Sequence, residues 1–330
     1  MARYIKYNLN HYKENRFSEI LSQINKAGFS GILILPQKSG FDVNQAGLQH
    51  EFYPVDNIIN LCNKSGLDII LELKIFESPY LWQHKNFTQP VNYNNIPYYP
   101  AEKENYYPVC PNNPVAEARF YNLINRLKKL PDSISFLISE LGFPFNWKSN
   151  SLIIQYSQPP FCYCPFCMGE FSQYIGEKII EPEQIQDNIR YWMDWRVNVI
   201  YKYFDKLFSV LLDRELIISI PPLSLIDLPF VTAQIPIAFL KDNARIGAPL
   251  LHRLIDKKFS WVIRQLDHYD LEMEERDLVP IFNVDPLVMD KHKQLERKDF
   301  ADVIYSDWTD YSKLCLKKDG KEFKSSNTGV

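Results

Sequence analysis

The sequence predicts a single-domain (β/α)8 barrel, the TIM-barrel class of α/β folds, and three observations support this prediction. The chain has 330 residues, a length that α/β barrels often reach as one domain. Stretches with helical spacing of apolar residues alternate with short apolar runs along most of the chain. Hydrophobic residues make up 46% of the sequence, enough to fill a substantial core.

The first half of the chain repeats one pattern of helix, turn and strand. In "FSEILSQINKAGFSGILILP" the apolar residues follow a helical spacing up to Gly28, and a buried strand follows at 32–35. The segment "VDNIINLCNKSGLDIILELKIF" repeats the pattern with Gly66 as the helix cap and a strand at 69–73. "PVAEARFYNLINRLKKLPDSISFLISE" does so again, ending in a strand near 135–139. Such repeats indicate a parallel sheet covered by helices.

Further along, a long helix in "YWMDWRVNVIYKYFDKLFSVLLDRE" precedes the strand "LIISIPP", and "LVPIFNVDP" and "DFADVIYSDW" predict two more strands. A doubly wound open sheet is the alternative, but no Gly-rich phosphate turn follows an early strand. We expect the barrel to span residues 1–315, followed by a polar tail at 316–330, with long loops at 74–112 and 141–190 after the third and fourth strands. The expected strands lie near 4–8, 31–35, 69–73, 134–139, 216–220, 279–283 and 302–306, with an eighth in "LPFVTAQIPIAFL" (228–240).

Charge and hydropathy exclude several classes of partner. Lys and Arg number 37 and Asp and Glu 40, so the net charge is −3, and no basic run is present to neutralise nucleic-acid phosphates. No stretch reaches the roughly 18 apolar residues of a membrane helix, and the first residues lack the apolar region of a secretory signal. We therefore expect a soluble, cytoplasmic protein that binds neither nucleic acid nor membrane; an oligomer stays open.

Three cysteines of the sequence "FCYCPFC" lie within six residues, in the second long loop. Cys162, Cys164 and Cys167 can reach one centre, and Cys110, at the end of the first long loop, can supply a fourth thiolate. Four thiolates suit Zn²⁺ in a closed tetrahedron, which is a structural site because no position is left for water. The alternatives are incidental free thiols, a redox switch or a nucleic-acid zinc module. We expect Cys62 and Cys315 to be ordinary residues.

"VCPNNP" followed by "CYCPFCMGEFSQYIG" resembles the zinc-site pair of glycoside hydrolase family 42 β-galactosidases and related glycosyl-hydrolase barrels. The later "WMDWRVNVIYKYFDKL" is similar to a helix of that family, and the detailed match covers about residues 106–210. The resemblance implies that Cys110, Cys162, Cys164 and Cys167 bind structural Zn²⁺. It also implies a carbohydrate substrate and two catalytic carboxylates at the ends of the fourth and seventh strands.

Glu140, in "SISFLISELGF", lies at the end of the fourth predicted strand, where the family has its catalytic acid/base. Ser139 stands where the family has Asn, and the segment between Glu140 and Cys162 is longer than in the family. The position suits general acid catalysis, because apolar neighbours at Leu141, Phe143 and Phe145 desolvate the carboxyl group and raise its pKa. A Glu that caps a turn or pairs with a nearby Lys is the structural alternative.

The second carboxylate is less well defined by the sequence. The family has a Glu at the end of the seventh strand, and "LVPIFNVDP" offers Asp285 there instead. Asp307, in "YSDW" on the last strand, is the competitor, and an Asp before Pro is also a common turn former. We expect one of these two residues to act as nucleophile or base.

Other polar and aromatic residues near strand ends are candidate substrate contacts. Alternation points Glu72 and Lys74 into the barrel mouth, where a buried ion pair is the alternative role. Three aromatic residues are candidate platforms for a sugar, although each is also a candidate for ordinary packing: Tyr107, Trp147 and Trp308. Asp194 and Arg196 lie on a predicted helix, where we expect a structural pair.

Together these features predict a zinc-containing glycoside hydrolase that cleaves a glycosidic bond through an oxocarbenium-like transition state. The competing hypothesis is a degenerate barrel that binds carbohydrate or a partner without turnover.

Overall fold

The computed structural model of the chain describes residues 1–9, 12, 14–37, 53, 55–83, 88–98, 106–145, 161–252, 257–270, 273–284, 300–308, 310 and 312. The predicted tail at 316–330, Cys315, Asp285 and Trp147 lie outside these residues. Within the described part, no helix has both the length and the apolar character needed to cross a membrane.

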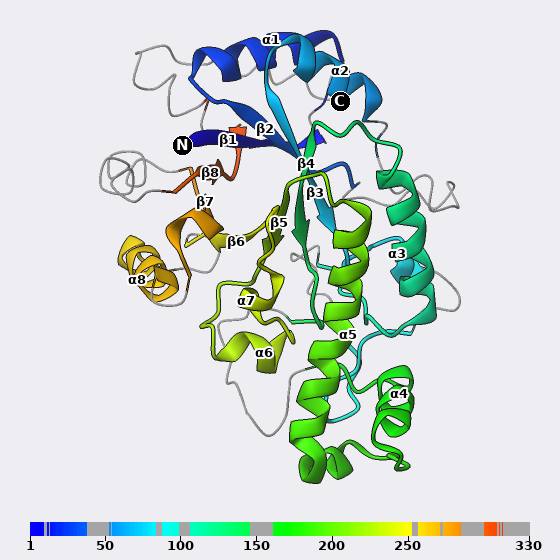
Figure 1. Cartoon of the computed structure of the whole chain (residues 1–330). Helices are drawn as coiled ribbons and strands as arrows, with labels where there is room; N and C mark the ends of the chain where they lie inside the picture. The colour runs from blue at the N-terminus through cyan, green and yellow to red at the C-terminus, as the bar shows by residue number, and fades with distance from the viewer. Residues whose placement is uncertain are drawn as a thin grey trace, which may run out of the picture.

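Eight parallel strands form a closed barrel in sequence order, and β8 pairs with β1 to close it (Figure 1). This confirms the predicted (β/α)8 class. The strands are β1 (Ala2–Tyr7), β2 (Gly31–Ile34), β3 (Asp68–Lys74), β4 (Ile134–Ser139), β5 (Leu216–Ser219), β6 (Ala244–Leu250), β7 (Leu278–Phe282) and β8 (Asp302–Tyr305).

Helices lie between the strands and cover the outside of the barrel (Figure 1). They are α1 (Glu14–Lys26), α2 (Asp56–Lys64), α3 (Pro114–Leu127), α4 (Pro165–Ile175), α5 (Ile189–Val210), α6 (Asp227–Val231), α7 (Pro236–Phe239) and α8 (Phe259–Asp270). Short 3₁₀ helices are described at Leu81–Gln83, Pro182–Asn188 and Glu275–Asp277. The helix α4 packs against α5 below the strands in Figure 1.

Local sequence explains where several helices begin and end. Gly28 and Gly66 follow α1 and α2 with φ of +79° and +67°, a conformation that glycine adopts without steric cost. The side chain of Asn113 accepts a hydrogen bond of 3.0 Å from the backbone N–H of Val115 and so caps α3, with Pro114 at its first position.

The eighth strand was predicted at 228–240, and this prediction is wrong. That segment forms α6 and α7, while the sixth strand is β6, with the sequence "ARIGAPL". Alternation turns Arg245, Gly247 and Pro249 of β6 toward the barrel interior, so the strand lacks the continuous apolar run expected of a buried parallel strand. The apolar run at 228–240 instead reflects the burial of two short helices.

Two layers of apolar side chains hold the fold together. The larger layer lies between the outer faces of the strands and the helices, and it includes Phe17, Phe120 and Phe204, each at most 1% exposed. The smaller layer fills the barrel interior and contains Tyr4, Leu33, Ile70, Leu137, Ile217, Val279, Ile281 and Ile304. The interior is therefore packed, and the space left for a ligand lies at the end of the barrel where the strands terminate.

Candidate functional site

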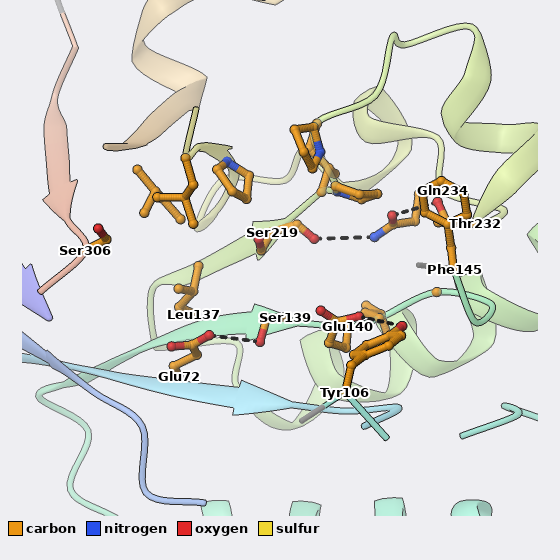
Figure 2. A pocket seen from close by; sticks show the side chains of 18 of the residues that line it. Glu72, Tyr106, Leu137, Ser139, Glu140, Phe145, Ser219, Thr232, Gln234 and Ser306 are labelled. Atoms are coloured by element: carbon orange, nitrogen blue, oxygen red, sulfur yellow. Dashed lines mark hydrogen bonds between the residues drawn. The ribbon is translucent and has the colours of Figure 1, made fainter. Parts of the chain in front are cut away.

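A pocket of about 840 Å³, its open mouth included, lies at the C-terminal ends of the strands (Figure 2). Its floor is partly polar and its walls are largely apolar. The described lining residues are Lys6, Leu33, Glu72, Tyr106, Leu137, Ser139, Glu140, Leu141, Gly142, Phe143, Phe145, Ser219, Ile220, Pro221, Pro222, Thr232, Gln234, Pro249, Leu251, Ile281 and Ser306. Among them, the carboxylate-bearing residues are Glu72 and Glu140.

Glu140 is the first residue after β4 and has a left-handed backbone with φ of +55°. Strict strand alternation would turn Glu140 away from the pocket, because Ser139 already faces it. The change of backbone conformation brings both side chains to the pocket lining. A non-glycine residue in this conformation carries strain that the surrounding structure must compensate, as commonly found at functional sites.

The Glu140 carboxyl group is set among charged and polar neighbours. The hydroxyl of Tyr106 donates a hydrogen bond of 3.2 Å to Glu140 Oε2 (Figure 2). Burial and the nearby Glu77 carboxylate raise the pKa of Glu140 to about 7, against the opposing influence of Lys74 and of the Tyr106 hydrogen bond. A substantial fraction of the group therefore carries a proton at near-neutral pH, as a general acid requires.

Glu72 has the opposite electrostatic setting on the neighbouring strand β3. Its Oε2 lies 2.5 Å from Lys6 Nζ, and its Oε1 accepts a hydrogen bond of 3.3 Å from the Ser139 hydroxyl. Although burial would raise its pKa, the ammonium groups of Lys6 and Lys74 hold the pKa of Glu72 below its usual value. The pocket thus combines a carboxyl group at its floor whose pKa is lowered with one at its side whose pKa is raised.

The wall opposite Glu72 is a hydrogen-bonded assembly from the segment around α6 (Figure 2). The Thr232 hydroxyl donates to Gln234 Oε1 at 2.9 Å, and Gln234 Nε2 donates to the carbonyl of Ser219 at 3.4 Å. The carbonyl of Thr232 accepts from the backbone N–H of Phe143 at 2.9 Å. These bonds join the segment after α6 to β5 and to the loop after β4.

The four cysteines predicted as metal ligands come together in one buried cluster. Their sulfur atoms all lie within 4.8 Å of one another, with Cys110 Sγ 3.3 Å from Cys167 Sγ and 3.6 Å from Cys164 Sγ. A tetrahedral Zn²⁺ site with Zn–S bonds of about 2.3 Å needs sulfurs about 3.8 Å apart, so the cluster fits a metal ion. N–H donors from Asn112 and Val91 reach two of the sulfurs at 3.4 Å.

The cluster joins the loops that follow β3 and β4, as the sequence predicts. Cys110 ends the segment before α3, and Cys164 and Cys167 lie at the start of α4. Each of the four cysteines is fully buried. Among the described residues, the side chains that belong to the group offer sulfur only, so it is a group of four thiols that could hold a metal ion.

Arg196 of α5 connects this loop region to the wall of the pocket. Its guanidinium group donates to the carbonyls of Phe161, Phe230 and Val231 at 2.7, 2.6 and 2.9 Å and lies over the ring of Phe143. The predicted pair between Asp194 and Arg196 is wrong. Asp194 is exposed, because side chains two positions apart on a helix do not face each other.

The remaining predicted residues are placed as follows. Tyr107 packs edge-on against Trp82 at 5.9 Å between ring centres and is not among the described lining residues; its neighbour Tyr106 is. Trp308 is 7% exposed and packs against Phe29 in the outer core. Asp307 is partly buried and also outside the described lining. Asp285 and Trp147 fall on residues that the structure does not describe.

Sequence reasoning missed several of the polar residues at this site. Lys6 on β1 could have been found by alternation, since it follows the inward-facing Tyr4 by two positions. Tyr106, Glu77 and Gln234 lie in loops, where no periodicity indicates the direction of a side chain.

Comparison with known proteins finds similar folds among solved structures. No family model and no curated protein matches the sequence. Among solved structures, the glycoside hydrolase domain of PgaB (BpsB) from Bordetella bronchiseptica has 11% identity and a TM-score of 0.69, over 98% of this chain and 100% of that one. The catalytic domain of β-amylase from Paenibacillus polymyxa has 10% identity and a TM-score of 0.58, over 98% and 95%.

A polyextremophilic β-galactosidase from the Antarctic haloarchaeon Halorubrum lacusprofundi matches with 12% identity and a TM-score of 0.62. The match covers 93% of this chain and 53% of the galactosidase, so this chain spans about half the length of that protein. At such low identity the likeness establishes the fold alone, a (β/α)8 barrel that these glycoside hydrolase domains share. Membership of family 42 stays a prediction.

Proposed function

We propose that the protein is a glycoside hydrolase of the family 42 type that uses Glu140 as its general acid/base. The observation that carries the proposal is a carboxyl group at the end of β4 whose surroundings raise its pKa to about 7 inside the pocket. In this role Glu140 donates its proton to the oxygen of the leaving sugar as the glycosidic bond breaks. The Tyr106 hydroxyl orients the carboxyl group and stabilises its ionised form.

Hydrolysis also needs a second carboxylate to stabilise positive charge on the sugar ring or to activate water. Asp285 after β7 and Asp307 after β8 stay the candidates, with nucleophile or base as their role. Glu72 is proposed to contact substrate hydroxyls at the floor. Lys74, Tyr107, Trp147 and Trp308 stay sequence-based candidates for substrate contact, although the described pocket lining does not include them.

For the cysteine cluster, we propose that Cys110, Cys162, Cys164 and Cys167 hold one Zn²⁺ ion. Bound there, the ion fixes the two long loops relative to each other. It takes no part in the chemistry, because four thiolates fill its coordination sphere.

One observation favours a second candidate function, a barrel that binds carbohydrate without turnover. In the described part of the pocket, the carboxylate other than Glu140 is Glu72, and Glu72 is already paired with Lys6. A pocket without a second available carboxylate would bind a sugar but cleave it poorly.

The test compares the wild-type protein with Glu140→Gln on a panel of nitrophenyl glycosides and on the matching disaccharides. Loss of the acid should lower kcat on a disaccharide by about 100-fold or more. The loss should be smaller for a dinitrophenyl glycoside, because that leaving group needs little protonation. Glu177→Gln, at an exposed position after α4, is the matched control.

Equal activity of wild type and Glu140→Gln on every substrate would refute the role of Glu140. Calorimetric titration with the same sugars distinguishes the second candidate function from the first, because binding with no product formed supports a non-catalytic barrel.

A further inference from the structure

A partly buried ion pair lies beside Glu140, and neither of its residues belongs to the lining described above. Lys74 Nζ is 2.8 and 2.7 Å from the two carboxylate oxygens of Glu77. The Glu77 side chain is 6% exposed and that of Lys74 25%. Both residues come from the end of β3 and the first residues after it.

Backbone hydrogen bonds keep this segment next to Glu140. Lys74 is in register with Ser139, and the pairing continues beyond the strands, since the N–H of Phe76 donates to the carbonyl of Glu140 at 3.0 Å. The pair is anchored from two further sides. Arg119 of α3 donates to the carbonyl of Lys74 at 3.2 Å, and Gln37 Nε2 donates to the carbonyl of Glu77 at 2.9 Å.

The charged groups around Glu140 do not balance when Glu140 is ionised. Among the residues that the structure describes, three carboxylates meet two ammonium groups here: Glu72 pairs with Lys6, Glu77 pairs with Lys74, and Glu140 accepts a hydrogen bond from the Tyr106 hydroxyl. Ionisation of Glu140 therefore adds an uncompensated negative charge to a largely buried cluster, which is costly. With Glu140 protonated the cluster is neutral.

We propose that Glu77 and Lys74 are positioning residues that set the proton affinity of Glu140 in opposite directions through their charges. Glu77 makes Glu140 hold its proton more tightly, while Lys74 loosens it. Among the described residues, Tyr106 and Glu72 also act on Glu140, and Glu72 is itself paired with Lys6. The effect of the pair on the Glu140 proton does not depend on the proposed function. Its consequence does rest on that function: with Glu140 as general acid, the pair sets the pH range in which the acid is protonated.

The two charges can be removed separately, and the signs of the two effects are opposite. Glu77→Gln removes a negative charge and leaves the Lys74 cation unpaired, so the pKa of Glu140 should fall. Lys74→Met removes the cation and leaves Glu77 unpaired, so the pKa of Glu140 should rise. Each change should alter the proton affinity by about tenfold, the size expected from one close charge of a partly buried pair.

The direct measurement is a titration of the Glu140 carboxyl by NMR in protein with ¹³C-labelled glutamate side chains, with Glu140→Gln to assign the signal. We expect the midpoint to move down in Glu77→Gln, up in Lys74→Met, and back near the wild-type value in the double variant. Where a substrate is turned over, the alkaline limb of kcat/KM should move with the same signs.

Glu77→Asp and Lys74→Arg keep the charges and should restore the wild-type midpoint, which a purely steric role would not predict. Midpoints that stay within about twofold in affinity, or that move in the same direction in both single variants, would overturn the inference. The titration needs no turnover, so a failure to cleave any glycoside would refute the proposed function and leave this result intact. If Glu77→Gln does not fold, Lys74→Met still gives the direction of the Lys74 effect. Comparison of Lys74→Met with the double variant then gives the direction of the Glu77 effect.

Discussion

At the scale of single residues, Glu140 combines a left-handed backbone with a carboxyl group that is unfavourable to ionise. Each feature alone lowers the stability of the folded state. The strand β4 and the bond from the N–H of Phe76 hold the backbone, and Tyr106 holds the side chain. Two destabilising features at one residue are typical of a residue that is retained for its chemical role.

The first prediction concerns the stability of Glu140→Gln. The pKa of Glu140 is raised from 4.5 to about 7 in the folded state, so the folded protein binds more protons than the unfolded chain between these values. The wild type therefore loses stability as pH rises from about 4.5 to 7, by up to about 3 kcal/mol. Glu140→Gln avoids this loss and should be more stable at pH 8 and no more stable at pH 4.

Urea unfolding at both pH values measures this difference. The exposed Glu177→Gln variant should follow the wild type at each pH. A Glu140→Gln protein with the same stability gain at pH 4 and pH 8 would show that the gain comes from packing and not from the charge.

The residues of the site could be predicted from the sequence only in part. Glu140 was found because it ends an apolar run, and Cys162, Cys164 and Cys167 because their spacing is short. Cys110 was found because it ends the loop that precedes the fourth strand's unit and because the family resemblance includes it. Tyr106 was missed in favour of Tyr107, since only the packing of Tyr107 on Trp82 shows which of the two faces the pocket. Glu77 was missed because its role depends on a contact with Lys74 in the folded chain.

At the scale of elements, the long loops after β3 and β4 each contribute side chains to the pocket lining, and the cysteine cluster joins these two loops. Val91 and Cys110 come from the loop after β3, while Cys162 comes from the loop after β4. Tyr106 lies only four residues before Cys110, so the position of the first loop also sets the position of the hydroxyl that reaches Glu140.

The second prediction is that the purified protein contains one Zn²⁺ ion per chain. Cys110→Ser and Cys164→Ser should lose the ion and unfold at lower temperature, because the long loops are then no longer linked. Cys62→Ser is the matched control, since Cys62 is also fully buried but lies on α2, outside the cluster. Elemental analysis by mass spectrometry gives the metal content, and thermal unfolding gives the stability.

Loss of zinc in all three variants, or in none, would contradict this assignment of the ligands. The melting temperature alone would not distinguish the cases, because any buried cysteine contributes to packing.

The elements themselves were predictable where their periodicity is strong. The helices α1, α2, α3 and α5 and seven of the strands lie where the sequence places them, within a few residues. The exception is β6, whose inward positions hold Arg245, Gly247 and Pro249. A strand whose inward positions hold a charged residue, a glycine and a proline has no continuous apolar run in its sequence. Only the closed barrel of the structure reveals it as a strand.

At the scale of the whole molecule, the barrel interior has three levels. An ion-pair network closes the end where the strands begin, with Arg245 bound to Glu215 and Asp302 and with Ser135 bound to Glu215. Apolar side chains fill the middle, and the polar floor around Glu72 forms the other end. The sequence predicts the number of β/α units and therefore a barrel. Which inward-facing side chains lie next to each other on neighbouring strands follows only from the strand register.

The third prediction separates these two ends of the barrel. Arg245→Met leaves the carboxylates of Glu215 and Asp302 without their cation, so the folded state should lose about 2–3 kcal/mol. The loss is below that of a fully buried pair because the Glu215 side chain remains 32% exposed. Urea unfolding measures it, with the exposed Arg264→Met of α8 as control.

The same variant should leave the titration midpoint of Glu140 unchanged, because the apolar middle level separates Arg245 from the pocket. If the midpoint moved as far as it does in Lys74→Met, charge at the far end would control the site as strongly as the adjacent ion pair. The division of the barrel into a stabilising end and a chemical end would then be wrong.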